Sequence, residues 1–134
     1  MVNERFTFRV HGERLAIARL AREADAPAWA RGEFVTLSRT PDELSIVCAQ
    51  QFVPAGVRCE RERIALGIEG VIEMTTIGIL ASLCAALAAA KVPVFVISTF
   101  DTDWLIVSAE RFEGARGALQ ALGHRVVGEL PPQR

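Results

Sequence analysis

The sequence predicts an α+β protein built from two ferredoxin-like (βαββαβ) units, the first with a shortened helix, packed as one body. Two observations predict this fold. From Arg63 onward the hydrophobic pattern follows the order β-α-β-β-α-β, and residues 34–52 align without gaps on residues 94–112. In that order, two helices pack on one face of an antiparallel sheet. A chain of 134 residues with 51% apolar residues is long enough to bury such a core.

The second half opens with a short strand and a helix. Arg63–Glu69 is the predicted strand. Thr75 or Thr76 can cap the helix, which we expect to run to about Ala90 because Pro93 prevents its continuation. Its inner face is predicted from the apolar residues at helical spacing, which are Ile77, Leu80, Leu83, Cys84 and Leu87.

A hairpin, a second helix and a last strand complete this half. Val94–Ser98 is rich in β-branched and aromatic residues and is predicted to be a buried central strand, with Trp104–Val107 as its hairpin partner. Ser108 can cap the second helix, which is expected to stop at Gly123, and residues 124–128 form the last strand. The predicted inner stripe of this helix consists of Phe112, Ala115, Leu119 and Leu122.

The first half is interpreted through the internal repeat. At an offset of 60 residues, Ser38 falls opposite Ser98 and Glu43 falls opposite Asp103. Most other aligned pairs keep their apolar or turn character. Two related units are therefore expected in one chain, one complete and one trimmed.

The trimming affects the first helix of the first unit. Arg14–Ala18 resembles Arg63–Gly67 at an offset of 49, which is 11 residues shorter than the offset of the hairpins. The first unit therefore keeps only a short helical piece near Ala26–Trp29. The predicted domains are a trimmed N-terminal unit at 1–62, a complete C-terminal unit at 63–128 and a tail at 129–134.

Composition narrows the functional classes. The 15 Lys and Arg against 16 Asp and Glu give a formal net charge of −1, which disfavours a nucleic-acid binder that neutralises phosphates. The longest uncharged stretch, Met74–Ala90, is short for a bilayer span and is interpreted as a buried helix, so no membrane association is expected. The N-terminal residues contain no apolar signal-peptide core, and we expect a cytoplasmic protein with reduced thiols.

The sequence contains no recognisable motif for catalysis, cofactors or metals. Cys48, Cys59 and Cys84 lack CxxC spacing, and His11 and His124 lie on separate elements without a nucleophile motif nearby. Neither a GxGxxG loop nor a P-loop is present. We therefore expect no metal, no cofactor and no enzymatic activity.

Two segments carry residues suited to a small ligand. Met74–Leu80 leads into a helix N-terminus, where unpaired N–H groups and partial positive charge favour a carboxylate. Gly78 either lets a ligand approach the backbone or permits close helix–strand packing. Ser98–Asp103 offers hydroxyls, an aromatic ring and two carboxylates, of which Asp101 or Asp103 can pair with an amine or guanidinium. The alternative interpretation of this second segment is an ordinary polar hairpin turn.

The stretch Gly78–Val107 resembles the ACT-domain family. It is similar to small bacterial tandem-ACT proteins and to the ACT units of the cytosolic arginine sensors (CASTOR), which are related to the regulatory domains of aspartate kinases. Leu37–Arg61 is similar to the N-terminal unit of those bacterial proteins. The resemblance covers roughly residues 15–127. It implies two ACT-type units with a regulatory role, in which paired units hold small ligands, usually amino acids.

The resemblance also implies which residues bind. Gly78–Leu80 matches a helix entry whose backbone contacts the charged ends of an amino acid, and Ser98–Phe100 matches a strand end of the sensors. Asp103 matches the aspartate that holds the guanidinium, whereas Thr76 replaces an acidic residue of the sensors and makes this pocket less acidic. The expected ligand-binding residues are Thr75, Thr76, Ile77, Gly78, Ile79, Leu80, Ser98, Thr99, Phe100, Asp101 and Asp103.

The expected function is regulatory. We expect the protein to bind a small-molecule amino acid without catalysing a reaction, to form a homodimer and to act on an unidentified regulated protein. The alternative is a homo-oligomeric or partner-binding interaction module with no small ligand, which uses a free sheet edge and an Ala-rich helix face. Titration with amino acids separates these two hypotheses.

Overall fold

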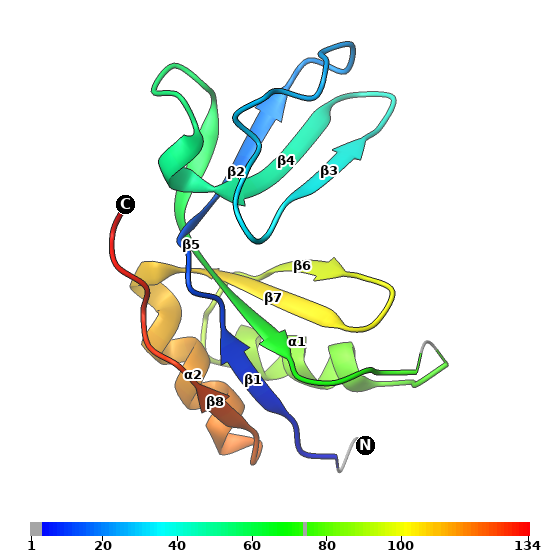
Figure 1. The fold of residues 1–134 in the computed structure, drawn as a ribbon. Helices are drawn as coiled ribbons and strands as arrows, with labels where there is room; N and C mark the ends of the chain where they lie inside the picture. Colours follow the sequence, from blue (N-terminus) through cyan, green and yellow to red (C-terminus); the bar gives the residue numbers. More distant parts are fainter. Residues whose placement is uncertain (1–3, 74) are drawn as a thin grey trace. The chain divides into compact units, whose positions relative to one another are not determined.

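The computed structural model describes residues 4–73 and 75–134, so the predictions that fall on residues 1–3 and on Met74 lie outside the described residues. The fold is α+β, as predicted (Figure 1). Its strands and helices are β1 (Thr7–Val10), β2 (Leu15–Leu20), β3 (Thr36–Arg39), β4 (Leu44–Ala49), β5 (Cys59–Ile68), α1 (Ile79–Ala89), β6 (Phe95–Ser98), β7 (Asp103–Ser108), α2 (Phe112–Ala121) and β8 (Arg125–Val127). Two short 3-10 turns, Gln50–Phe52 and Ala109–Arg111, follow β4 and β7.

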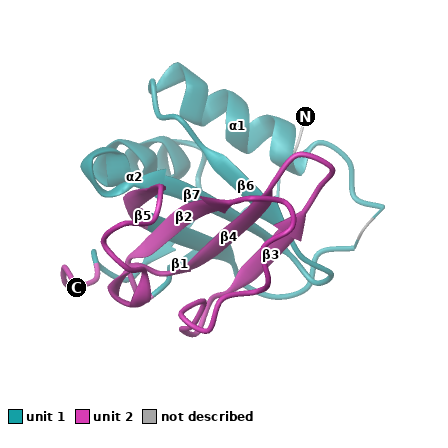
Figure 2. Ribbon diagram, turned by 90° about the horizontal axis from the view of Figure 1, so that it is seen from above, with its two compact units in different colours: residues 1–11, 64–130 teal, residues 12–63, 131–134 magenta. Residues whose placement is uncertain are grey.

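The chain forms two compact units (Figure 2). Unit 1 comprises residues 1–11 and 64–130, and unit 2 comprises residues 12–63 and 131–134. The first strand of the chain, β1, therefore packs with the second half. The predicted boundary between residues 62 and 63 describes the sequence repeat and stays a prediction.

Unit 1 contains a mixed sheet with the strand order β6-β7-β5-β1-β8. β1 runs antiparallel to β5 and parallel to β8, so it is inserted between the two strands that adjoin in a simple ferredoxin-like unit. Helices α1 and α2 lie side by side on one face of this sheet (Figure 2). The elements from β5 to β8 follow the predicted β-α-β-β-α-β order.

The core of unit 1 joins both helices to that face of the sheet. On α1, Leu83 and Leu87 are buried as predicted. Ile77 is 89% exposed, contrary to the prediction, because the helix begins only at Ile79 and Ile77 belongs to the loop before it. The fully buried side chains of this core include Phe8, Ile64, Leu66, Leu105, Phe112 and Leu119.

Helix α2 buries three of the four residues predicted on its inner stripe, Phe112, Ala115 and Leu119, and both of its ends are near the predicted positions. Ser108 accepts a hydrogen bond from the N–H of Arg111 at 3.2 Å and so caps the turn that leads into the helix. At the other end, the N–H of His124 bonds the carbonyl of Leu119 at 3.1 Å, a bond typical of helices that stop at a glycine. Leu122 was predicted on the inner stripe but is exposed, because the helix ends before it.

Strand β6 is an edge strand rather than the predicted central one. Among the described strands it pairs with β7, and Phe95 on it is 40% exposed. In a ferredoxin-like sheet, the strand that follows the first helix lies at the edge. A dense β-branched run therefore indicated a strand correctly but did not indicate its position in the sheet.

Unit 2 is a smaller antiparallel sheet formed by β3, β4, β2 and the first half of β5. Its core contains Ala16, Ala18, Leu44, Ile46, Cys48 and Val53. The predicted helical piece near Ala26–Trp29 is only a turn, closed by the N–H of Ala30 bonding the carbonyl of Pro27 at 3.2 Å. One turn closed by a single bond is too short to nucleate a helix.

The two hairpins of the sequence repeat differ in register. Ser98 lies opposite Asp103, whereas Ser38 lies opposite Ser45 and not opposite Glu43. The ladders are therefore shifted by two residues relative to the gapless alignment. An even shift keeps every side chain on its own face of the sheet, which explains why the apolar pattern of the repeat survives.

A close contact between neighbouring strands generates the first prediction. A Cβ at Gly67 would lie 2.5 Å from Cζ3 of Trp104, so Gly67→Ala is expected to displace the indole and destabilise the fold by about 1–3 kcal/mol. Urea unfolding measures the change. Gly117, on α2, has nothing within 4 Å of its Cβ position, and Gly117→Ala is the control that should be neutral or slightly stabilising. Equal destabilisation by the two variants would contradict the account.

His124 generates a second prediction, on pH. Its Nδ1 accepts a hydrogen bond from the N–H of Phe6 at 2.9 Å, and only 7% of the residue is exposed. Burial and, secondarily, the guanidinium of Arg5 lower the pKa of His124, so the folded protein binds the proton less tightly than the unfolded chain does. The contribution to stability is complete above the unfolded pKa of about 6.5 and is lost as the pH falls through the folded pKa.

The measurement is urea unfolding at a series of pH values between about 5 and 8, for the wild type and for His124→Gln. The unfolding free energy of the wild type is expected to rise with pH over the lower part of this range, more steeply than that of the variant. If the unfolding free energy of both proteins changed equally with pH, the proposed contribution of His124 would be contradicted.

Candidate functional site

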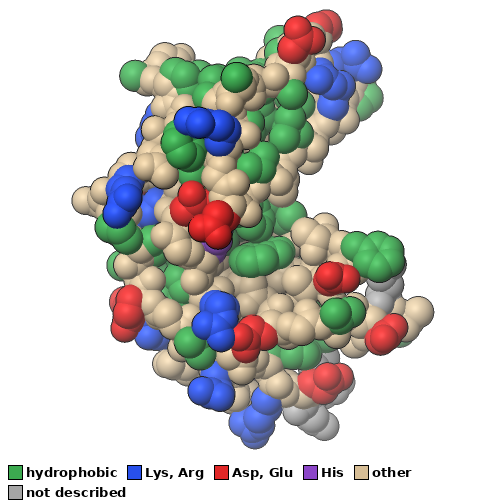
Figure 3. Space-filling view, viewed as in Figure 1, with side chains coloured by type: hydrophobic (Ala, Val, Ile, Leu, Met, Phe, Trp, Pro, Cys, Tyr) green, Lys and Arg blue, Asp and Glu red, His purple; other side chains and the backbone are tan. Residues whose placement is uncertain are grey.

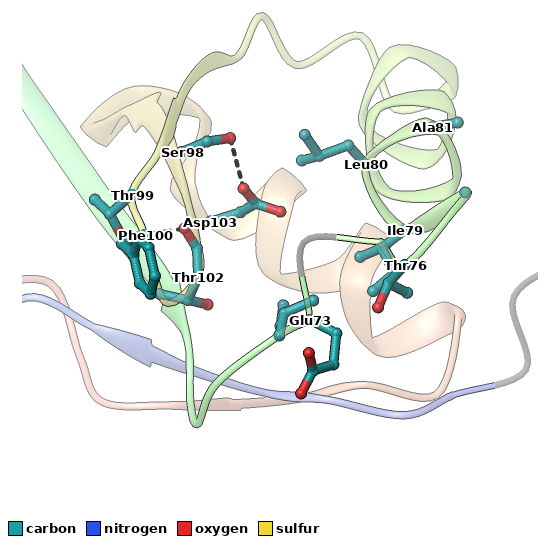
Figure 4. A pocket seen from close by; sticks show the side chains of 12 residues that line it. Glu73, Thr76, Ile79, Leu80, Ala81, Ser98, Thr99, Phe100, Thr102 and Asp103 are labelled. Carbon is teal, nitrogen blue, oxygen red and sulfur yellow. Dashed lines mark hydrogen bonds between the residues drawn. The ribbon is translucent and has the colours of Figure 1, made fainter.

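A cavity of about 310 Å³ lies in unit 1 between the start of α1, the loop after β5 and the β6–β7 hairpin (Figure 4). Its walls come from segments that are separate in sequence and adjacent in the fold. The lining residues are Ile72, Glu73, Thr76, Gly78, Ile79, Leu80, Ala81, Ser98, Thr99, Phe100, Thr102 and Asp103.

One wall is the N-terminus of α1. Gly78 precedes the helix with φ of 91°, a conformation that glycine adopts at little cost, and in the described structure it receives no side-chain cap. The first intrahelical bond runs from the N–H of Ser82 to the carbonyl of Gly78 at 3.0 Å. The N–H groups of residues 79–81 therefore have no acceptor within the helix, and this end carries partial positive charge. The predicted threonine cap is wrong, because the helix begins at Ile79 and not at Thr75 or Thr76.

The opposite wall is the open end of the β6–β7 hairpin. Ser98 and Asp103 are direct cross-strand partners, and the Ser98 hydroxyl donates to Oδ1 of Asp103 at 2.6 Å. In Figure 4 the second carboxylate oxygen of Asp103 points toward α1, across the cavity. Hydrogen bonds to a carboxylate are stronger than neutral ones, so this bond restricts the rotamer of Asp103.

Hydrogen bonds join the hairpin to the loop that leads from β5 to α1. The N–H of Ile72 bonds the carbonyl of Asp101 at 2.7 Å, and the hydroxyl of Thr102 donates to the carbonyl of Ile68 at 3.0 Å. These bonds place Ile72 and the following Glu73 on the cavity wall.

The structure brings together most of the residues predicted from the sequence. Thr76, Gly78, Ile79, Leu80, Ser98, Thr99, Phe100 and Asp103 line the cavity. Thr75, Ile77 and Asp101 are not among its lining residues in the described part of the chain, and Met74 lies outside the description. Whether the lining residues bind a ligand stays a prediction.

Sequence reasoning missed Ile72, Glu73, Ala81 and Thr102. Ala81 lies one residue beyond the predicted helix entry, and Thr102 was inside the quoted hairpin segment but was not selected. Ile72 and Glu73 reach the cavity only through the bond from Ile72 to Asp101, a contact for which the sequence carried no signal.

The charges of the lining are asymmetric. Its ionisable side chains are the carboxylates of Glu73 and Asp103, and no Lys, Arg or His belongs to the described lining. The exposed surface elsewhere mixes both signs, as the face in Figure 3 shows. Among the described residues of the lining, positive polarity comes from the helix N-terminus, opposite the acidic hairpin.

Exposed apolar side chains lie in both loops that contribute to the cavity wall. Ile77 is 89% exposed and Val71 is also exposed in the loop between β5 and α1, and Phe100 is 81% exposed in the β6–β7 turn. Phe100 lines the cavity as well, so its ring can shield a bound molecule from water.

A second cavity, of about 340 Å³, lies in unit 2, and two of its charged residues, Glu13 and Arg14, are engaged within the fold. Arg14, which lines it, donates to the carbonyl of Pro131 at 2.9 Å and to the carboxylate of Glu62 at 2.5 Å. Gln50 also donates to Glu62, and this bond and the one from Arg14 lower the pKa of Glu62. The carboxylate of Glu13 accepts the N–H of Glu33 at 2.9 Å. The cavity of unit 1 is therefore the candidate functional site.

Within residues 4–73 and 75–134, no group of three or more His, Cys, Asp or Glu is placed to hold a metal ion. Over the same described ranges, no helix is long and apolar enough to cross a membrane.

Comparison with known proteins identifies the family. A family model described as an ACT domain matches residues 58–121, and a second model, described as an N-terminal domain, matches residues 13–56. The chain therefore contains an ACT domain, at residues 58–121. The ACT resemblance inferred from the helix entry and the hairpin is thus confirmed. The comparison with curated proteins gave no significant match.

Solved structures agree with this fold. A protein from Agobacterium tumefaciens has a TM-score of 0.89 at 32% identity, covering 98% of this chain and 99% of that one. A Vibrio cholerae protein of unknown function, described as a possible transport protein, has a TM-score of 0.71 at 18% identity, covering 90% and 92%. The regulatory subunit of aspartate kinase from Thermus flavus has a TM-score of 0.60 at 13% identity, covering 85% and 95%. The predicted ferredoxin-like ACT fold is confirmed.

The backbone at the helix entry generates a third prediction. Gly78→Ala is expected to destabilise the fold by about 1 kcal/mol, because a side chain at φ of 91° is strained. Thermal unfolding followed by circular dichroism measures the change. Gly56 also lies in a loop, but open space surrounds its Cβ position, so Gly56→Ala is the control. Equal melting temperatures for the two variants would contradict the strain argument.

Proposed function

We propose that this chain is a regulatory ACT protein that binds an amino acid in the cavity of unit 1 and catalyses no reaction. One observation carries the proposal. The unpaired N–H groups at the start of α1 and the carboxylate of Asp103 face each other across a cavity of about 310 Å³.

The chemistry of these two walls suits a zwitterion. A ligand carboxylate is stabilised by the N–H groups of residues 79–81 and by the positive end of the helix. A ligand ammonium is stabilised by Asp103, whose second oxygen points into the cavity. The apolar side chains of Ile72, Ile79 and Leu80 between these poles accommodate aliphatic parts of the ligand.

The side chains of the site favour binding over catalysis. General acid–base and nucleophilic catalysis most often rely on His, Cys, Lys or an activated hydroxyl. The described lining contains none of the first three, and the Ser98 hydroxyl is engaged by Asp103. The neighbours described as regulatory subunits of aspartate kinase support a regulatory role for the same fold.

A regulatory protein without catalytic activity acts through another protein or another copy of itself. We propose that the protein acts in the cytoplasm on a partner protein or through a homodimer. We also propose that residues 63–128 form the complete ACT repeat and residues 1–62 the trimmed one, with 129–134 as a tail.

A second candidate function has one observation in its favour. Strand β6 is an edge strand with a half-exposed Phe95, and such an edge can add a strand from a second chain. The protein would then be an interaction module without a small ligand. A dimer by sedimentation that no amino acid affects would favour this alternative.

The fourth prediction tests amino-acid binding. Each of the twenty amino acids is added at millimolar concentration to ligand-free protein in a thermal-shift assay. A ligand at about 100 times its Kd adds roughly 2.7 kcal/mol to the unfolding free energy, which raises the melting temperature by several degrees. Asp103→Asn is expected to weaken the shift, because it removes the charge that faces the ammonium.

The matched control is Asp42→Asn, in the turn of the β3–β4 hairpin of unit 2, which is not among the residues that line the cavity. It should leave every shift unchanged. If wild-type protein shows no shift with any amino acid, the proposal is wrong. If Asp42→Asn and Asp103→Asn reduce the ligand-induced thermal shift equally, the proposal that the ligand binds in this cavity is wrong.

A further inference from the structure

We propose that Thr102 is a positioning residue that holds the loop at residues 69–73 against the β6–β7 hairpin and thereby sets the shape of the ligand cavity. This inference rests on the proposed function and deepens it, because it assigns a role to a residue that need not touch the ligand. The geometry of the hairpin turn carries the argument.

Thr102 makes one bond that leaves its own turn. Its hydroxyl donates to the carbonyl of Ile68, the last residue of β5, at 3.0 Å and across 34 positions of sequence. The neighbouring carbonyl, that of Asp101, accepts the N–H of Ile72 at 2.7 Å. Two consecutive residues of the turn therefore hold both ends of the segment 68–72.

The hydroxyl of Thr102 is not needed to close the turn itself. Backbone atoms close it, because the N–H of Thr99 bonds the carbonyl of Thr102 at 2.8 Å. The hairpin of unit 2 is closed in the same way by the N–H of Thr40 and the carbonyl of Glu43 at 2.9 Å. Thr40 holds the turn position of Thr99, and both hydroxyls donate inside their own turns, to the carbonyl of Glu43 and to the carbonyl of Thr102 at 3.1 Å. The position of Thr102 is taken in unit 2 by Glu43, which has no hydroxyl, so the bond to Ile68 belongs to the hairpin at the cavity and not to its repeat.

The held segment forms part of the cavity wall. Ile72, at the end of the held segment, and the next residue, Glu73, both line the cavity. On its other side the segment is anchored to β1, because the N–H of Glu69 bonds the carbonyl of Thr7 at 2.9 Å. If the bond from Thr102 is lost, residues 70–73 can move away from the hairpin while the strands of the sheet stay paired. Such a movement widens the space between Glu73 and Asp103.

The fifth prediction compares Thr102→Val with Thr102→Ser and Thr40→Val. Valine keeps the branched shape of threonine but cannot donate, serine restores the hydroxyl, and Thr40→Val perturbs the corresponding turn in unit 2. In ligand-free protein, amide hydrogen exchange at Ile72 is expected to be about three- to tenfold faster in Thr102→Val, as loss of one hydrogen bond predicts. Exchange in Thr102→Ser and Thr40→Val should match the wild type.

The same variants are then titrated with the amino acid that gives the largest thermal shift in the wild-type screen. Thr102→Val should bind it about three- to tenfold more weakly, and Thr102→Ser should restore the affinity. An unchanged exchange rate at the Ile72 amide in Thr102→Val would overturn the proposal that Thr102 holds the loop. Faster exchange with unchanged affinity would show a purely structural bond and would overturn the positioning role.

The experiment distinguishes failure of this inference from failure of the proposed function. If no amino acid raises the melting temperature of the wild-type protein, the binding proposal fails, and the amide exchange rates alone then decide whether Thr102 holds the loop. If Thr102→Val does not fold, Thr102→Ala takes its place, since it removes the same hydroxyl with less bulk. Loss of folding in Thr102→Ser as well would overturn the proposal, because that variant keeps the donor.

Discussion

The arrangement of unit 1 depends on one shared apolar surface, where α1 and α2 pack on a single face of the sheet. Phe112 and Leu119 of α2 and Leu83 and Leu87 of α1 are buried against this face. Burial of apolar surface is the main favourable term in folding, so this packing fixes where each helix begins and ends relative to the strands. The start of α1 is held opposite the β6–β7 hairpin as a result, and the cavity is a consequence of that placement.

The site is polarised without a basic side chain. Glycine at the start of α1 leaves backbone N–H groups uncapped, and the hairpin supplies an acidic residue oriented by a serine. Each feature alone has an ordinary structural explanation: a glycine helix start, or a polar turn. Their combination on facing walls of one cavity is what distinguishes a candidate binding site from two unrelated local motifs.

Much of the fold could be predicted from the sequence, because short-range patterns determine it. Helix periodicity located Leu83 and Leu87, and turn chemistry located Ser108 and the end of α2. Some errors are local, because Ile77 and Leu122 lie outside the helices to which they were assigned. The others concern long-range placement. β1 joins the second half, β6 is an edge strand, and Glu73 reaches the cavity through a bond between the loop and the hairpin. No local pattern encodes these contacts, because they arise from the order of strands in the sheet.

The account is tested most directly by an NMR titration of the ligand-free protein with the twenty amino acids. One of them is expected to shift the backbone amide signals of residues 79–81 and of residues 98–103 together, because these segments form the two polar walls. Signals of the β3–β4 hairpin in unit 2 should not move. The absence of shifts with every amino acid, or shifts confined to residues outside the cavity, would contradict the central claim.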